Sequence, residues 1–518
     1  MASGQLPKVA KAEDLTVRDG KLTWSSHGVS DEIDVGSLLF ALKPPASAHQ
    51  YIICGLKENN SESAATTFEL VLLQTSSIPD QISSLHLVSQ IPPHLRPSTD
   101  NLVDIVVSTK AGSGLALRFW QAVLHPLLRV AREELAQASP GTEAAKLAGS
   151  SQQESVLVTE SAGSVPQFAQ RLWASHGGQA HRDGVDGGKQ SRTVILLSGD
   201  GGVVDILNSC EEDHDAQAPA ASSSPPQPLV CPLPLGTGNA LFHSLHKPVA
   251  SARPASSPLV LGLQTLFQGA PANLPTFRAS FSAGSRVVVA AAEGQQHQAA
   301  ADGGGATDTP PELLQEEGGN NRPVSYLNGA VVASYGFHAS IVHESDTPAY
   351  RAHGQKRFGM VAQELLRRSH PYTAQVEIRR PGAASLERVP RETHAYVLVT
   401  PLSNLERTFA ISPDSRPLDG RLRAVHFGPI GGERIMDVMM RAYDGGKHVG
   451  LAWEEDGERV WYDEVEDIRL KALDADGRWR KVCIDGTIVE LPVGGDVVVS
   501  KSNHTLLRVL APKEVLPA

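Results

Sequence analysis

The chain has 518 residues, 41% apolar and 20% charged content, and a formal net charge of −11. This composition is typical of a globular protein with two to four domains, and the acidic balance argues against a broad nucleic-acid-binding surface. Four scattered cysteines without a CxxC pair argue against a structural zinc site and indicate a reducing compartment. The chain shows no signal-peptide core and no run of about 20 apolar residues. We therefore expect a cytoplasmic protein that contacts membranes peripherally.

Residues 1–100 are predicted to form a small β-rich module. Turn residues separate the short apolar stretches 22–24, 38–40, 51–53 and 68–73, and a Pro-rich linker follows at 91–97. The module either docks a lipid or protein or is simply an additional sheet, and we favour the additional sheet.

From 102 to 250 the pattern alternates between strands and helices. Strands are expected at 104–107, 155–158, 193–197 and 229–233, and helices at 115–130, 166–173, 203–208 and 240–245. Repeated βα units predict an α/β domain with a parallel, Rossmann-like sheet. Ligands of such sheets bind beyond the carboxyl ends of the strands, where this chain places Gly, Ser, Thr and Asn.

The segment 257–515 is dominated by predicted strands, with two clear helices at 357–368 and 432–442. It predicts a mainly β, sandwich-like substrate domain, interrupted near 294–323 by a Gly-rich insertion that buries too little apolar area to be ordered. Clefts between domains are common ligand sites, so we expect the substrate to bind between the two domains.

Three Gly-rich turns follow strands of the predicted parallel sheet, at 108–114, 198–202 and 234–239. Each turn alone is ordinary, and Asp200 within the second turn could merely cap a helix. Together they predict a phosphate site, because backbone N–H groups at helix N-termini bind phosphate and the turns share one edge of the sheet. A carboxylate inside such a site indicates phosphoryl transfer rather than nucleotide storage.

These segments resemble the catalytic domain shared by diacylglycerol kinases, sphingosine kinases and ceramide kinases. The resemblance covers about residues 102–510 and rests on Ser108–Gly114, Thr159-Glu160, Ser198–Gly201 with Asp205, Leu233–Asn239, the segment 335–358 with its two arginines, and Cys483–Thr487. It implies an ATP- and Mg²⁺-dependent lipid kinase that phosphorylates a lipid hydroxyl at a membrane surface.

The resemblance also implies roles for individual residues. Asp200 would accept the proton of the lipid hydroxyl as a general base. Asp205 and Asp485 would hold Mg²⁺, and Glu344 and Asp346 would contact the substrate. The nucleotide would be bound by Ser108, Gly112, Gly114, Thr159, Ser198, Gly199, Gly201, Gly236, Thr237, Gly238, Asn239, Arg351, Arg357 and Asp485. The two arginines of this set would neutralise charge that develops on the γ-phosphate.

Three positions depart from the family pattern. Ser108 replaces an Asn, Thr487 replaces a Glu, and Ser340 stands where sphingosine kinases carry an acidic residue suited to a cationic amine. The Gly-Thr-Gly-Asn and Ser-Gly-Asp-Gly turns nevertheless favour a sphingoid base as substrate, with ceramide or diacylglycerol as alternatives.

Structural interpretations of the same residues stay open. The two arginines could lie on a solvated helix face, Asp205 could complement a helix N-terminus, Thr159 could end a strand, and Asn239 could cap a helix. Two other functions also stay open: a soluble nucleotide kinase of the NAD-kinase or phosphofructokinase type, and a catalytically weak lipid-binding or scaffold protein.

Overall fold

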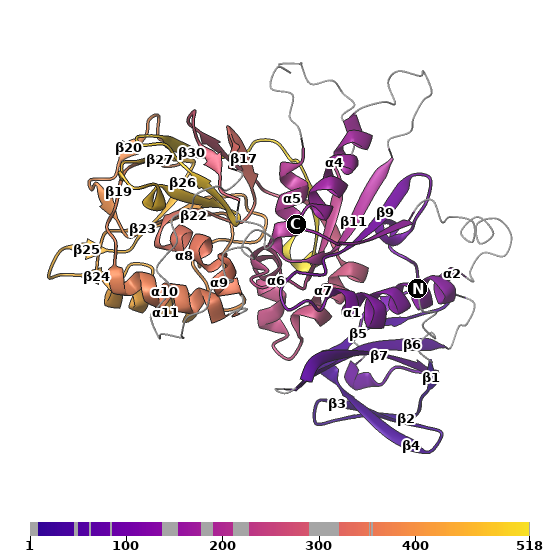
Figure 1. The fold of residues 1–518 in the computed structure, drawn as a ribbon. Helices are drawn as coiled ribbons and strands as arrows, with labels where there is room; N and C mark the ends of the chain where they lie inside the picture. The colour runs from indigo at the N-terminus through magenta and orange to yellow at the C-terminus, as the bar shows by residue number, and fades with distance from the viewer. Residues whose placement is uncertain are drawn as a thin grey trace, which may run out of the picture. The chain divides into compact units, whose positions relative to one another are not determined.

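A computed structural model describes residues 9–45, 50–61, 64–82, 85–136, 154–177, 190–210, 227–289, 321–351, 353 and 356–516. The chain divides into two compact units (Figure 1): unit 1 comprises Met1–Leu274 with His504–Ala518, and unit 2 comprises Pro275–Asn503. Two segments that the sequence patterns placed in the C-terminal domain, 257–274 and 504–515, belong to unit 1.

Most of the expected insertion at 294–323 lies outside the described residues. Its last two residues form β16 (Arg322–Pro323), which pairs with β15 (Arg286–Val287). This end of the expected insertion is therefore part of a sheet.

A six-stranded sheet in the order β10–β9–β11–β12–β31–β13 forms the centre of unit 1. The first five strands are parallel and β13 is antiparallel to β31. The strands are β9 (Asn101–Val107), β10 (Glu154–Val158), β11 (Ser191–Ser198), β12 (Leu229–Pro234), β13 (Ala270–Asn273) and β31 (Arg508–Ala511). The four predicted strands are thus present and parallel, whereas the fifth comes from the far end of the chain.

Helices connect these strands, as the alternating pattern predicted. They are α1 (Ala116–Phe119), α2 (His125–Ala136), α4 (Ser164–Gly177), α5 (Asp200–Asn208), α6 (Ala240–Ala252) and α7 (Pro258–Gln268). A π-helical turn, Trp120–Leu124, joins α1 to α2. Pro126, the second residue of α2, has no N–H to donate to the preceding turn. The sequence patterns missed α7, although Ser257 caps it through the Val260 N–H and Pro258 begins it.

The N-terminal module of unit 1 consists of a five-stranded sheet, β1–β7–β6–β5–β8, and a three-stranded sheet, β2–β3–β4. It shares a hydrophobic core with the α/β part, in which the Phe40 and Phe267 rings lie 4.4 Å apart and Phe68 meets Phe119 edge-on at 5.2 Å. The strands are β1 (Ala10–Lys11), β2 (Glu13–Arg18), β3 (Lys21–Ser26), β4 (Val29–Asp34), β5 (Leu38–Leu42), β6 (Tyr51–Ser61), β7 (Ala64–Thr75) and β8 (Leu87–Val88).

Unit 2 is β-rich and contains two large antiparallel sheets with one hydrophobic core between them, and a separate two-stranded sheet of β24 (Ala452–Trp453) and β25 (Glu458–Arg459). The first has the order β17–β14–β30–β27–β19–β20, with β21 also paired to β19, and the second has the order β16–β15–β29–β28–β18–β22–β23–β26. Their remaining strands are β14 (Phe277–Phe281), β17 (Tyr326–Gly329), β18 (Ala333–Gly336), β19 (Tyr372–Arg379), β20 (Glu387–Arg388), β21 (Thr393–His394), β22 (Tyr396–Thr400), β23 (Leu422–Phe427), β26 (Trp461–Val465), β27 (Asp467–Ala472), β28 (Lys481–Ile484), β29 (Thr487–Glu490) and β30 (Asp496–Lys501).

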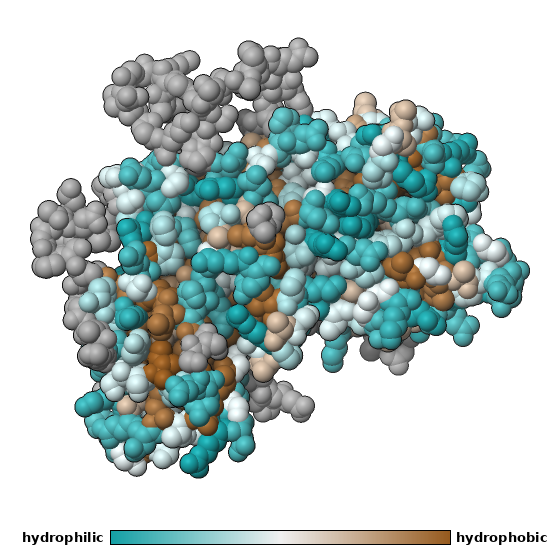
Figure 2. Space-filling view, turned by 180° about the vertical axis from the view of Figure 1, so that it is seen from behind, coloured by the Kyte–Doolittle hydropathy of each residue, from teal (hydrophilic) through white to brown (hydrophobic). Residues whose placement is uncertain are grey.

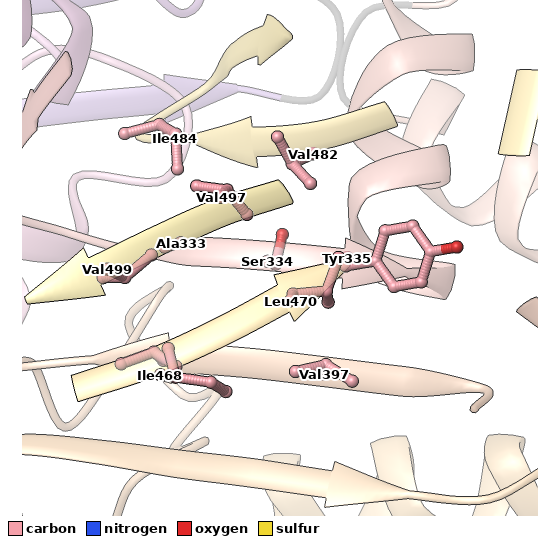
Figure 3. A pocket seen from close by; sticks show the side chains of 11 residues that line it. Ala333, Ser334, Tyr335, Val397, Ile468, Leu470, Val482, Ile484, Val497 and Val499 are labelled. Atoms are coloured by element: carbon pink, nitrogen blue, oxygen red, sulfur yellow. The ribbon is translucent and has the colours of Figure 1, made fainter. Parts of the chain in front are cut away.

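The interior between these two sheets is apolar and closely packed. Figure 3 shows Val397 of one sheet facing Ile468 and Leu470 of the other. The cavity that they line has a volume of about 20 Å³, which is close to the space that one water molecule needs.

The α-helices α8 to α11 of unit 2 lie together on one side of its strands in Figure 1. α8 packs on strands β18, β22 and β28, and α10 packs against α8 and α11. Their bounds are α8 (Phe337–Ser345), α9 (Pro348–Arg351), α10 (Lys356–Arg368) and α11 (Gly432–Tyr443). The sequence patterns predicted α10 and α11 but missed α8.

The face seen in Figure 2 is mainly hydrophilic, with apolar side chains in separate patches. Within the described ranges, no helix is both long and apolar enough to span a membrane.

Candidate phosphate-binding site

The strand order of unit 1 creates a switch point at the carboxyl ends of β9 and β11. The chain passes from β9 to β10 on one side and then returns to β11 on the other side of β9. In open parallel sheets, ligands bind at such a reversal. Ser108 and Thr159, which directly follow β9 and β10, and Ser198, the last residue of β11, all lie at this edge. The Ser108 N–H donates to the Leu197 carbonyl and the Thr159 N–H to the Val107 carbonyl.

The three Gly-rich turns touch one another at this edge. A Cβ atom on Gly236 would lie 2.2 Å from the Gly199 Cα, and one on Gly112 would lie 2.6 Å from the Leu235 carbonyl oxygen. Only glycine allows backbones to approach so closely. The structure therefore places side by side the backbones of Gly199 and Gly236, which are 37 residues apart in the sequence, and those of Gly112 and Leu235, which are 123 residues apart.

Asn239 fixes the third turn. It adopts the left-handed conformation with φ 51° and ψ 43°, its Oδ1 accepts from the Gly236 N–H at 2.9 Å, and its Nδ2 donates to the Gly236 carbonyl at 3.0 Å. These two bonds connect the ends of the turn, between which lie the exposed Thr237 and the partly buried Gly238. Asn239 precedes α6, but its side chain makes no cap bond to that helix.

The Asp200 carboxylate instead caps α6. Asp200 is the first residue of α5, and its two oxygens accept hydrogen bonds from the Ala240 N–H at 2.7 Å and the Leu241 N–H at 3.0 Å. Burial raises the pKa of this carboxyl, while the backbone donors act in the opposite direction. The bonds tie the second turn to the helix that follows the third turn.

The first turn is held by the end of β10. The buried Thr159 hydroxyl accepts from the Thr109 N–H at 3.0 Å, and the Thr109 hydroxyl donates to the Thr159 carbonyl at 2.8 Å. Gly112 and Gly114 follow with φ of 54° and 73°, where other residues are strained. Thr159 thus positions a turn as well as ending a strand.

The second turn offers open space. The Ser198 carbonyl accepts from the Leu235 N–H at 3.2 Å, which links the second turn to the third. Gly201 is exposed, and a Cβ added there would meet no atom within 4 Å. The start of α5, a helix of nine residues, is therefore open at Gly201, and the helix dipole there favours an anion.

Asp205 lies five residues beyond Asp200 in α5, about 140° around the helix axis from it. Burial raises the pKa of Asp205 to about 6, and none of the described residues donates a hydrogen bond to its carboxylate. The two carboxylates therefore do not form a shared site through α5. Across the described parts of the chain, no three His, Cys, Asp or Glu side chains are grouped as a metal site would require.

The Asp485 carboxylate is fully engaged in unit 2. It accepts hydrogen bonds from the N–H groups of Ala330 at 2.6 Å, Val331 at 3.0 Å and Val332 at 2.6 Å. These three residues interrupt the predicted strand 329–335, which forms as β17 and β18 instead. Asp485 (φ 49°) and Gly486 (φ 90°) make the two-residue turn of the β28–β29 hairpin. An Asp-Gly pair between apolar runs is typical of such a hairpin, but the strands on either side of it were not predicted from the sequence.

The acidic residues assigned to the substrate also have partners. The buried Glu344 accepts from the Arg478 Nε at 3.0 Å and from its Nη2 at 2.6 Å. Asp346 accepts a two-pronged hydrogen bond from Arg351. Sequence reasoning missed Arg478, because it lies 134 residues beyond Glu344 in a segment without a motif.

No protein-family model matches the chain, and no curated protein matches it. Among solved structures, it is similar to a diacylglycerol kinase from Bacillus anthracis str. Sterne, with 12% identity and a TM-score of 0.42 over 80% of this chain and 98% of that chain. A candidate diacylglycerol kinase from the same strain has 13% identity and a TM-score of 0.45 over 81% and 98%.

Proposed function

We propose that the protein is an ATP-dependent lipid kinase. The observation that carries this proposal is the contact of three Gly-rich turns, through Gly112, Gly199 and Gly236, at the switch point of a parallel sheet. The exposed Gly201 at the start of α5 lies at this edge, and a helix N-terminus at a switch point suits the phosphates of a nucleotide. The order of the surrounding motifs, which resembles that of lipid kinases, supports a lipid as the acceptor.

Asp200 is the proposed general base. Its two oxygens each accept one backbone N–H, and a carboxylate has lone pairs left to accept a proton from a lipid hydroxyl. The raised pKa makes Asp200 a stronger base than an exposed aspartate. Its bonds to α6 hold the carboxylate in place, so that the base is positioned before the substrate binds.

Mg²⁺ would neutralise charge on the phosphates when bound. This ion usually takes one or two protein carboxylates and completes its octahedron with water and phosphate oxygens. Asp205 fits such a role because it is a carboxylate without a hydrogen-bond donor among the described residues. Asp485 fits less well, since three backbone N–H groups already occupy its oxygens.

Three lipid alcohols are in question: a sphingoid base, ceramide and diacylglycerol. A sphingoid base carries an amine and needs an unpaired carboxylate for its recognition. Glu344 is neutralised by Arg478 and Asp346 by Arg351, and the Ser340 hydroxyl lies 2.8 Å from the Tyr372 hydroxyl. These pairings favour a neutral lipid, ceramide or diacylglycerol, over the sphingoid base that the turn motifs alone favoured.

A lipid-panel assay tests the proposal. Purified full-length protein is given Mg²⁺ and labelled ATP with sphingosine, ceramide or diacylglycerol in mixed micelles, and the phosphorylated lipid is measured. The proposal expects transfer to one of the three lipids and at least a 100-fold loss of turnover in Asp200→Asn. Transfer to NAD instead of a lipid would favour a soluble nucleotide kinase, and ATP or lipid binding without turnover would favour a scaffold protein.

Contact with a membrane surface is the remaining part of the proposal. α11 exposes Met436, Met440 and Tyr443, which are spaced at i, i+4 and i+7 and so form one stripe along the helix. An exposed apolar stripe on an amphipathic helix suits the interface of a bilayer. Sedimentation with phosphatidylcholine vesicles should recover the wild-type protein, and the double variant Met436→Glu/Met440→Glu should stay in the supernatant.

A further inference from the structure

A buried polar cluster lies where the apolar core between the two large sheets of unit 2 ends. Leu422 and Ala424 of β23 belong to that core, and His426 is the next residue on the same face of the strand. His394 of β21 lies opposite the core residue Tyr372 of β19 and so faces the same interior. His426 is 2% exposed and His394 is 0% exposed, so both histidines are shielded from bulk water.

The polar atoms of these histidines lack partners. Neither ring nitrogen of His426 and neither ring nitrogen of His394 makes a hydrogen bond to a described residue. His394 lies near the Ala374 backbone, but not in hydrogen-bond geometry. The Asp463 Oδ2 is likewise buried without a donor, 3.9 Å from the His426 Nε2. Buried polar groups are normally paired, so these five atoms in one place indicate that a bound polar group completes the cluster.

Three arginines surround His426, namely Arg391, Arg380 and Arg459. Burial lowers the pKa of His426 most, and the charges of these arginines lower it further, so the charges that act most on this ring are positive. The Arg391 Nη1 donates to the Glu458 carboxylate at 3.0 Å, whereas the Arg391 Nε and Nη2 have no acceptor among the described residues. The interior beside His426 is therefore rich in N–H donors.

The carboxylates near the cluster do not use up these donors. Asp463 accepts from the Nε and the Nη2 of Arg380, each at 3.3 Å. Glu387, the other partner of Arg380, is 63% exposed and therefore screened by water. Arg459 has no carboxylate partner in the described ranges and lies over the Trp461 ring, 3.4 Å from its centre. An anion supplies the acceptors that this arrangement lacks, whereas a cation would be repelled.

We propose that unit 2 binds a small oxyanion, with the chemistry of a phosphate or a carboxylate, at His394, His426 and Arg391. The oxygens of the anion accept hydrogen bonds from the two imidazoles and from Arg391, whose planar guanidinium suits an oxyanion. Because the histidines are almost fully buried, the ligand is a small free ion rather than part of a bulky molecule. The site consists of unit 2 residues alone, so it does not depend on the proposed kinase function.

Binding of the anion should be coupled to uptake of a proton. Without the anion the two histidines are neutral near pH 7, because burial and the neighbouring arginines lower their pKa. A negative charge beside the rings raises their pKa again. A protonated His426 can also donate to Asp463, whose Oδ2 then has a partner. The affinity for the anion should therefore increase as the pH falls.

Calorimetric titration of the full-length protein with sodium sulfate tests the proposal, since sulfate stays doubly charged between pH 6 and pH 8. Sodium chloride keeps the ionic strength constant, and a parallel titration with sodium acetate tests a carboxylate. The proteins compared are the wild type, His426→Phe, Arg459→Gln and the control Arg434→Gln. Arg434 also lies over a tryptophan, 5.3 Å from the centre of the Trp453 ring, but is not among the charges that lower the pKa of either histidine.

Sulfate binding to the wild type should tighten about 3- to 10-fold from pH 8 to pH 6. His426→Phe should weaken it about 10-fold or more, the size of a charge-assisted hydrogen bond. Arg459→Gln should weaken it about 2- to 5-fold, and Arg434→Gln should behave as wild type. Acetate binding with the same pattern among the variants would assign the site to carboxylates.

The absence of saturable binding of both ions would overturn the proposal, and water would then be the partner of the buried nitrogens. Binding that neither His426→Phe nor Arg459→Gln weakens would overturn it as well, because an ion at the candidate phosphate site of unit 1 does not respond to these variants. Arg459→Gln changes an exposed side chain and decides the question alone if His426→Phe does not fold.

Discussion

The Asp200 carboxylate and the Leu241 backbone N–H lie 3.0 Å apart, although 41 residues separate them in the sequence. This contact, with the neighbouring bond to Ala240, attaches the start of α5 to the start of α6. Because both helices begin at Gly-rich turns, the contact holds two walls of the candidate phosphate site together. Asp200 therefore combines a structural role with the proposed role of general base.

Two substitutions separate these roles of Asp200. Asp200→Ala removes both cap bonds and should lower the free energy of unfolding of unit 1 by about 1–2 kcal/mol. Asp200→Asn keeps one acceptor oxygen, so it should lose less stability but at least 100-fold in turnover. Thermal unfolding and single-turnover kinetics measure the two effects, and full activity in Asp200→Asn would contradict the role as a base.

Gly236 and Gly201 offer a matched pair of glycines in the same site. Gly236→Ala forces a Cβ to within 2.2 Å of the Gly199 backbone and should separate the turns. Gly201→Ala meets no atom within 4 Å, and alanine is about 1 kcal/mol more favourable than glycine inside a helix. We therefore expect a lower melting temperature in Gly236→Ala, and an unchanged or higher one in Gly201→Ala.

Nucleotide binding should respond differently from stability in this pair. If phosphates approach the N-terminus of α5, the added methyl group of Gly201→Ala lies in their path and weakens ATP binding without unfolding the protein. Calorimetric titration with ATP measures this effect. Wild-type ATP affinity in a folded Gly201→Ala variant would place the phosphates elsewhere.

The sequence predicted local features better than distant ones. The strands β9 to β12 and the three turns were predictable, because each is encoded by a short apolar run followed by glycine. The partners of Asp200, Glu344 and Asp485 were not predictable, since each bond joins segments that only the folded chain brings together. The same holds for β31, whose neighbour β12 lies almost 280 residues earlier in the chain.

Two buried histidines in unit 2 should make its stability sensitive to acid. Burial, and then the charge of Arg391, lowers the pKa of His394 to about 4, and burial lowers that of His426 to about 3, with further contributions from Arg391, His394, Arg380 and Arg459. Both pKa values lie below that of an unfolded histidine, so the unfolded chain binds more protons in acid. Stability is then fully present above about pH 6.5 and falls as the pH decreases towards 4.

The size of this effect can be measured. Between pH 6.5 and 5, each such histidine should cost about 2 kcal/mol of unfolding free energy. Denaturant titrations at pH 7, 6 and 5 should show this decline, and a folded His426→Gln variant should show a smaller one. A free energy of unfolding that is constant over this pH range would contradict the inference that His394 and His426 are buried as neutral side chains.

The last strand of the chain should be essential to the first unit. β31 pairs with β12 and β13, and within and beside it Leu507, Val509 and Leu510 are buried. Each buried apolar side chain contributes about 1.5–3 kcal/mol, so deletion of residues 504–518 should unfold the α/β part and abolish ATP binding. Deletion of residues 513–518 keeps β31 and serves as the control. Circular dichroism and ATP titration distinguish the outcomes. ATP binding that survives the longer deletion would show that the candidate phosphate site does not depend on the fifth parallel strand.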